Sequence, residues 1–119
     1  MLDSIFFISY NTLVLLEKKL TYIKLFDEYR LLLTEKQQQI FALHFLEDLS
    51  FTEIAINLAI SKQAVNDSLK KSSDQLEQLE QKLRLVEKQE RRDTLIDRLL
   101  ELSTAADIRQ TLVELKEIA

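Results

Sequence analysis

The chain of 119 residues contains no glycine and no proline. Glycine supplies the positive-φ backbone that tight β-hairpin turns need, so a fold built from hairpins is disfavoured. Proline, which interrupts helices, is missing as well. What remains is rich in leucine and in charged side chains, with 46% hydrophobic and 30% charged residues. This composition predicts an all-α protein of about one domain.

The residue types that are missing also exclude several classes of active site. Without glycine, the chain cannot form a dinucleotide-binding turn or a P-loop, because both bring the backbone close to phosphate. It has no cysteine and one histidine, His44, which excludes a thiol nucleophile, a thiolate zinc site and two-histidine metal motifs. His44 has no recognisable catalytic partner, so we expect a structural role. We therefore predict no catalysis, no metal site and no cofactor.

Capping residues mark the helix boundaries. The runs Thr34-Glu35-Lys36-Gln37 and Ser50-Phe51-Thr52-Glu53 fit the capping box, in which a hydroxyl and a later side chain satisfy free backbone amides reciprocally. Together with apolar residues spaced by three and four, these signals predict helices near residues 12–32, 35–47, 51–58, 62–91, 94–102 and 105–118.

The most informative stretch is F-T-E-I-A-I-N-L-A-I-S-K-Q-A-V-N-D-S-L, residues 51–69. It predicts a helix-turn-helix: Ile54 and Leu58 point to the core from the first helix, and Val65 and Leu69 anchor the second helix from beneath. A helical corner without any nucleic-acid role has the same apolar spacing and is the alternative.

The turn of this motif lacks its usual residue. Ala59 stands where helix-turn-helix turns often have glycine, so we expect the turn to avoid a strongly left-handed conformation there. Ser61 is expected to cap the second helix.

Charge is distributed unevenly along the chain, whose net charge is −4. Residues 62–92 carry eight basic and six acidic residues, net +2, whereas the segments on either side are each net −3. Because Val65 and Leu69 face inward, the outward face of the second helix is predicted to bind nucleic acid through Lys62, Gln63, Asn66, Lys70 and Lys71. Asp67 and Asp74 on the same helix oppose that role. A second basic edge at Lys88, Arg91 and Arg92 is an alternative contact for RNA.

A heptad-like pattern follows the motif. The residues Leu76, Leu79, Leu83 and Val86 are spaced by alternating three and four positions, which predicts a helix–helix seam and a homodimer, or else an antiparallel contact within the chain. The apolar residues of the last two predicted helices indicate a C-terminal helical hairpin. We divide the chain into an N-terminal apolar extension (1–15), a helix-turn-helix domain (16–72), and the continuation of the long helix with the hairpin (73–119).

The apolar N-terminus does not read as a targeting segment. Asp3 is its early charge, and the apolar run is shorter than the ~20 residues that span a bilayer. We expect a cytoplasmic protein without membrane insertion. A start codon assigned too far upstream would explain residues 1–15 equally well.

One family resemblance is carried by L-F-D-E-Y-R-L-L-L-T-E-K-Q-Q-Q-I-F-A-L-H-F-L-E-D-L-S-F-T-E-I-A followed by I-S-K-Q-A-V-N-D. This sequence closely resembles the YlxM family of small bacterial proteins, whose helix-turn-helix is similar to the fourth region of sigma factors. The resemblance covers roughly residues 16–90. Lys62 stands where the family commonly has arginine, and Asn66 where it commonly has tyrosine.

The resemblance implies a fold and a function. The fold would be all-α, with a sigma-region-4-like helix-turn-helix, a long helix and the C-terminal hairpin. The function would be that of a non-enzymatic accessory protein of the signal recognition particle pathway, binding the particle's RNA or its GTPase. The alternative is a sequence-specific transcriptional regulator that reads DNA with Lys62, Gln63 and Asn66. The modest basic excess favours RNA or a protein partner over duplex DNA.

Overall fold

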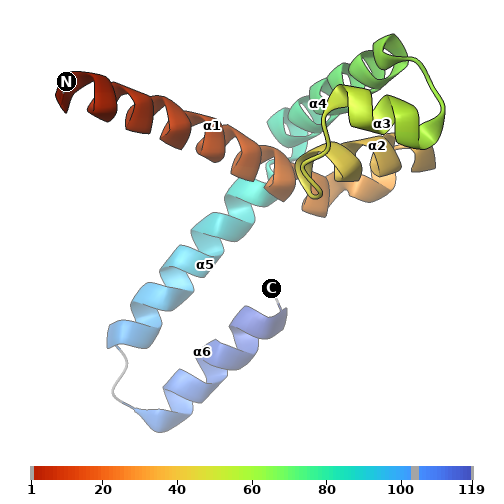
Figure 1. Cartoon of the computed structure of the whole chain (residues 1–119). Coiled ribbons are helices and arrows are strands. Elements are labelled where there is room, and N and C mark those ends of the chain that lie inside the picture. Colours follow the sequence, from red (N-terminus) through yellow and green to blue (C-terminus); the bar gives the residue numbers. More distant parts are fainter. Residues whose placement is uncertain (1, 103–104, 119) are drawn as a thin grey trace. The chain divides into compact units, whose positions relative to one another are not determined.

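The fold is all-α, as predicted. The computed structural model describes the backbone of residues 2–102 and 105–118, and the side chains of residues 11–102, 105–106 and 108–117. These residues form helices and no strand (Figure 1). The elements are α1 (Leu2–Tyr29), the short 3₁₀ helix η1 (Arg30–Leu32), α2 (Glu35–Phe45), α3 (Phe51–Leu58), α4 (Lys62–Leu83), α5 (Leu85–Leu102) and α6 (Ala106–Ile118).

The chain divides into two compact units, residues 1–82 and residues 83–119. The first unit contains α1 to α3 and α4 up to Lys82, and the second contains α5 and α6. The domain boundary that we predicted between residues 72 and 73 falls inside α4 and inside the first unit. None of the described helices combines the length and the apolar character that a membrane crossing requires.

An aromatic cluster forms the centre of the first unit. Phe26 of α1 stacks on Phe41 of α2 with 4.7 Å between ring centroids, and Phe41 stacks on Phe45 at 4.4 Å. Phe26 and Phe41 are fully buried, together with Tyr29. Offset aromatic pairs of this kind add stability beyond the area they bury, about 0.5–1.5 kcal/mol each. The cluster therefore fixes the crossing of α1 on α2.

The capping signals locate two helices correctly. Thr34 Oγ1 accepts a hydrogen bond from the Gln37 amide at 3.2 Å, and the Gln37 side chain accepts one from the Thr34 amide at 3.0 Å. The same reciprocal box forms at the start of α3. The helices predicted from residues 35 and 51 accordingly begin where expected.

The prediction of one continuous helix over residues 62–91 is wrong. α4 ends at Leu83, and Arg84 adopts a left-handed backbone with φ of 54° before α5 begins at Leu85. The helix predicted to begin near residue 94 is part of α5. The predicted 12–32 helix also differs: α1 begins at Leu2 and gives way to η1 after Tyr29.

The second unit is a hairpin of α5 and α6. Ile96 is its buried apolar residue. Arg109 Nη1 donates to the Leu100 carbonyl at 2.6 Å, and Lys116 forms an ion pair with Asp97. Leu100, near the end of α5, contacts Arg109 near the start of α6, and the earlier Asp97 contacts the later Lys116. The two helices therefore run antiparallel. A C-terminal hairpin is therefore present, with α5 longer than the helix predicted for it.

Candidate functional site

The start of α3 is held by a capping box. Ser50 Oγ accepts a hydrogen bond from the Glu53 amide at 3.1 Å, and the Glu53 carboxylate accepts one from the Ser50 amide at 3.3 Å. Ile54 on this helix is fully buried. The cap and this one apolar anchor set the direction of α3 toward the turn.

The expectation for the turn is wrong at Ala59. Its backbone is left-handed, with φ of 54° and ψ of 45°. An L-residue in this region costs about 1–2 kcal/mol, because Cβ crowds the carbonyl oxygen. The hydrogen bond from the Ile60 amide to the Ala55 carbonyl, at 3.0 Å, closes α3 in spite of that cost. The alanine therefore takes the conformation of a glycine helix cap.

The second helix of the motif has the predicted orientation. Ser61 Oγ accepts a hydrogen bond from the Ala64 amide at 3.0 Å and so caps α4. Val65 is fully buried and Leu69 is 5% exposed. The five predicted nucleic-acid-binding residues, Lys62, Gln63, Asn66, Lys70 and Lys71, are all exposed.

The exposed side of α4 also contains acidic groups. Gln63 Nε2 donates a hydrogen bond to Asp67 Oδ1 at 2.9 Å, so its amide is held along the helix. Asp74 lies two turns further along the helix and is exposed too. The positive charges of the three lysines in the candidate set are therefore partly cancelled by these two carboxylates, and the exposed side of α4 is only weakly positive.

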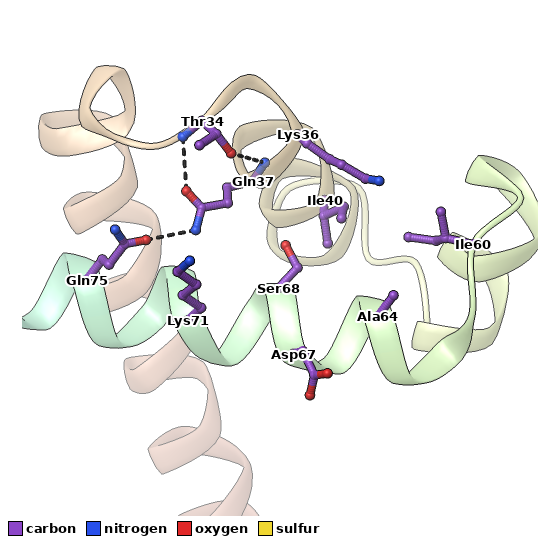
Figure 2. Close-up of a pocket in the computed structure, with 10 residues that line it drawn as sticks. All are labelled: Thr34, Lys36, Gln37, Ile40, Ile60, Ala64, Asp67, Ser68, Lys71 and Gln75. Carbon is purple, nitrogen blue, oxygen red and sulfur yellow. Dashed lines mark hydrogen bonds between the residues drawn. The ribbon is translucent and has the colours of Figure 1, made fainter.

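A groove between α2 and α4 adjoins this face (Figure 2). Its volume is about 360 Å³. Lys71 and Ser68 point into it from α4. Its walls comprise Thr34, Lys36, Gln37, Ile40, Ile60, Ala64, Asp67, Ser68, Lys71 and Gln75.

One wall of the groove is fixed by a buried amide. Gln37 is 8% exposed, and its Nε2 donates to Gln75 Oε1 at 2.8 Å. The wall on α2 was not found from the sequence. The capping box at Thr34 does predict where the first turn of α2 begins. The sequence does not indicate that this turn lies beside α4.

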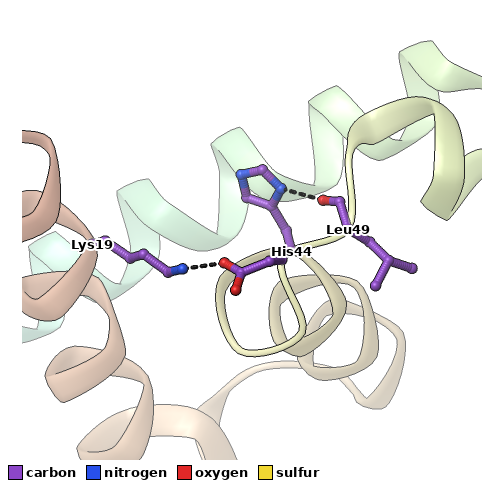
Figure 3. A network of polar contacts seen from close by, with 4 residues as sticks. Lys19, His44 and Leu49 are labelled. Carbon is purple, nitrogen blue, oxygen red and sulfur yellow. Dashed lines mark hydrogen bonds and ion pairs between the residues drawn. The ribbon is translucent and has the colours of Figure 1, made fainter. Parts of the chain in front are cut away.

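A second groove lies where α1 meets the loop between α2 and α3. Lys19 forms an ion pair with Asp48, and His44 Nδ1 lies 2.9 Å from the Leu49 carbonyl oxygen (Figure 3). His44 also makes edge contacts with Phe45 and Phe51. These contacts fit the structural role expected for His44. The groove, of about 480 Å³, also contains Tyr22 and Leu15 in its walls.

The predicted oligomer seam is not one continuous helical face. Leu76 is fully buried in the core of the first unit, and Leu79 is half-buried. Leu83 ends α4, Arg84 interrupts the helix, and Val86 belongs to α5. The alternative basic edge, Lys88, Arg91 and Arg92, is exposed on α5.

The fold and the α3–turn–α4 geometry define a helix-turn-helix protein. Residues 16–117 match the family described as "Putative helix-turn-helix protein, YlxM / p13 like", and the chain belongs to this family. It is 45% identical over 104 residues to the UPF0122 protein of Mycoplasma capricolum, covering 87% of this chain and 90% of that protein. It is 38% identical over 102 residues to the UPF0122 protein YlxM of Bacillus subtilis, covering 86% of this chain and 93% of that protein.

Proposed function

We propose that the chain is a non-enzymatic accessory protein of the signal recognition particle pathway, which docks the particle's RNA or its GTPase through the exposed side of α4. The pathway is the one that the resemblance to the YlxM family implies, and the chain belongs to that family. The observation that supports this mode of binding is the exposure of Lys62, Gln63 and Asn66 on α4. The opposite side of the same helix is buried at Val65 and Leu69. A helix oriented in this way presents amide and ammonium groups to a partner without any rearrangement of the core.

The choice of partner rests on the charge of this side of the helix. A protein that makes ~6–10 phosphate contacts with duplex DNA normally has a strong basic excess. Here Asp67 and Asp74 stand among Lys62, Lys70 and Lys71. A folded RNA can be bound through fewer simultaneous phosphate contacts than a long duplex, and an acidic and polar protein surface requires none. These two ligands are therefore favoured over a long duplex.

Sequence-specific binding of duplex DNA is the second candidate. It is favoured by the exposed amides of Gln63 and Asn66, because amide side chains can pair bidentately with adenine. The hydrogen bond from Gln63 to Asp67 would have to break before Gln63 could read a base.

A titration at two salt concentrations tests both candidates. The full chain is titrated against the particle's RNA, against its GTPase, and against random genomic duplex. Binding to the RNA or to the GTPase that is weakened by Lys70→Ala and Lys71→Ala supports the proposal. Lys24→Ala, on the exposed side of α1, is the charge-matched control and should have no effect.

The opposite result identifies the alternative. A response to duplex alone, with a preferred sequence and a steep dependence on salt, would overturn the proposal in favour of DNA. Gln63→Ala should then relax the sequence preference, whereas a lysine substitution should weaken all sequences alike.

A further inference from the structure

The groove between α2 and α4 brings together two lysines from different helices. Lys36 lies in the first turn of α2, Lys71 lies on α4, and both line the groove. In Figure 2 the Lys71 side chain rises from α4 toward α2, the Lys36 side chain extends from α2, and the Ser68 hydroxyl lies between their two ammonium groups. The periodicity of α4 predicts only Lys71 as a binding residue, because Lys36 belongs to another helix.

Neither of these lysines is neutralised by a carboxylate. Within the part of the chain that the structure describes, no ion pair and no hydrogen bond involves the ammonium group of Lys36 or of Lys71. Asp67 is the acidic residue among those lining the groove. Its side chain points away from α2 and accepts a hydrogen bond from Gln63. Among the described residues, two positive charges therefore border the groove and no carboxylate points into it.

The groove also has a hydroxyl donor and a fixed frame. The Ser68 side chain is half-buried and makes no hydrogen bond with the described residues, so its O–H can turn toward a ligand. Gln37, which follows Lys36 on α2, is 8% exposed and donates to Gln75 on α4 at 2.8 Å. Gln75 lies about one turn beyond Lys71. The backbone positions of the two lysines are therefore fixed relative to each other before a ligand binds.

The position of Lys36 does not favour the stability of α2. Thr34 caps this helix, so Lys36 is its second residue. At that position the helix dipole favours an acidic side chain and disfavours a cation. Local helix stability therefore does not explain the lysine, whereas a negatively charged ligand for its ammonium group does.

We propose that the groove binds a phosphate group, with Lys36, Lys71 and Ser68 as its donors. The oxygens of a phosphate can accept from both ammonium groups and from the hydroxyl together. In an inference that rests on the proposed function, this phosphate belongs to the backbone of the folded RNA. The RNA then contacts the first turn of α2 as well as the exposed side of α4.

A nucleic-acid strand fits this arrangement better than a single acidic side chain does. Phosphates recur along a strand, so the groove and a neighbouring lysine can contact successive phosphates. Such a lysine is present, because Lys70 is exposed and lines a shallower depression on α4 together with Lys71. One carboxylate of a protein partner would leave most of these ammonium groups without a negative charge.

A titration of the full chain against the particle's RNA over a range of salt concentrations tests the site. Lys36→Ala should weaken binding about three- to tenfold near about 0.1 M salt. It should also reduce the slope of log affinity against log salt by about 0.7–1, as expected for the loss of one phosphate contact. Lys36→Arg should retain most of the affinity. Lys24→Ala, on the exposed side of α1, is the charge-matched control and should bind like wild type.

A variant that fills the groove distinguishes occupation of the groove from a general effect of charge. Ala64 is exposed and lines the groove, so Ala64→Leu adds bulk there and leaves every charge in place. It should weaken binding of the RNA, whereas Gln81→Leu, at an exposed position of α4 outside the groove, should not. The urea midpoint of Lys36→Ala should not fall, because a cation in the first turn does not stabilise α2. A lower midpoint would indicate a structural role for Lys36 and count against the proposal.

Inorganic phosphate probes the site without RNA. Added to the full chain at constant ionic strength, with chloride as the reference anion, it should shift the backbone amide resonances of Lys36, Ser68 and Lys71. These shifts should be lost in Lys36→Ala and kept in Lys24→Ala. Equal shifts in both variants would mean that phosphate does not bind in the groove.

The outcomes separate this proposal from the proposed function. If Lys70→Ala weakens binding of the RNA and Lys36→Ala does not, the proposed function stands and the groove proposal is overturned. If the chain binds no RNA, the proposed function fails; a response to inorganic phosphate confined to the groove would then support the site with a different phosphate ligand, and no response would overturn it. If Lys36→Ala weakens binding of the GTPase alone, the groove binds an acidic protein surface and the phosphate proposal is wrong.

Discussion

Tyr22 on α1 donates a hydrogen bond from its phenol to the Glu77 carboxylate on α4, with 2.6 Å between the oxygens and 55 residues between the two positions. Tyr29 donates to Glu80 in the same way, also at 2.6 Å. Two tyrosines on the first helix thus hold two carboxylates on the helix that carries the candidate surface. The position of α4 depends on polar contacts as well as on the aromatic core.

The Tyr22–Glu77 contact predicts a loss of stability in alkali. The hydrogen bond to Glu77, then burial, then the charges of Glu77 and Asp74 raise the pKa of Tyr22 from 10.0 to about 12. Because the folded-state pKa is the higher one, the contribution of Tyr22 is complete below pH 10 and is lost as the pH rises through 12. Thermal unfolding of wild type and Tyr22→Phe across this window should show an extra decline in wild type alone. Parallel curves for the two proteins would contradict the assignment.

The left-handed turn at Ala59 predicts a stabilising substitution. Ala59→Gly removes the crowding of Cβ, and part of the gain is offset by the greater freedom of glycine in the unfolded chain. We expect the free energy of unfolding to rise by about 0.5–1 kcal/mol in urea titrations. Ala42→Gly, inside α2, is the control and should lower it by a similar amount. A decrease for Ala59→Gly would mean that the turn is not left-handed in solution.

The parts of the fold predicted correctly are those whose signals are local in the sequence. Thr34 and Ser50 begin helices because a capping hydroxyl acts within three residues of itself. The left-handed conformation of the turn at Ala59 and the helix break at Arg84 were not predicted, since neither residue type favours positive φ. At Ala59 this conformation accompanies the hydrogen bond from the Ile60 amide to the Ala55 carbonyl, which the residue type at position 59 does not indicate.

The candidate surface shows the same division. The exposure of Gln63 and Asn66 followed from Val65 and Leu69, because on a helix the burial of one side determines which residues face away. The hydrogen bond from Gln63 to Asp67 was not predicted, although its spacing of four residues permits it. The α2 wall of the adjoining groove depends on tertiary packing, which the periodicity of a single helix does not encode.

Ser72, on the buried side of α4, provides a test of how this helix packs in the core. Its side chain is fully buried, and its hydroxyl has no hydrogen-bond partner among the described residues. A buried hydroxyl without a partner costs about 1–3 kcal/mol, so Ser72→Ala should stabilise the protein by about 1 kcal/mol. Ser73→Ala, at the half-buried neighbouring position, controls for helix propensity. If both variants gain equally in urea titrations, the hydroxyl of Ser72 is satisfied in solution.

The capping box of α3 should be important for the whole motif, because this helix has only eight residues. Ser50→Ala removes the acceptor for the Glu53 amide and should lower the free energy of unfolding by about 1 kcal/mol. Ser50→Asp, which can still cap, is expected to retain most of that stability. Chemical denaturation of the three proteins measures the effect, and equal midpoints would show that the cap does not contribute.

Asp67 should limit the affinity of α4 for a polyanion in two ways, by its charge and by its hold on Gln63. Asp67→Asn removes the charge while keeping an acceptor for the Gln63 amide, whereas Asp67→Ala removes both. At low salt, the loss of one negative charge near a phosphate should raise affinity for RNA roughly two- to fivefold, and the gain should shrink as salt is added. A further gain in Asp67→Ala would mean that the freed Gln63 amide contacts the ligand. Asp27→Asn on α1 is the charge-matched control. If Asp67→Asn binds RNA no better than Asp27→Asn at any salt concentration, the exposed side of α4 is not where phosphate binds.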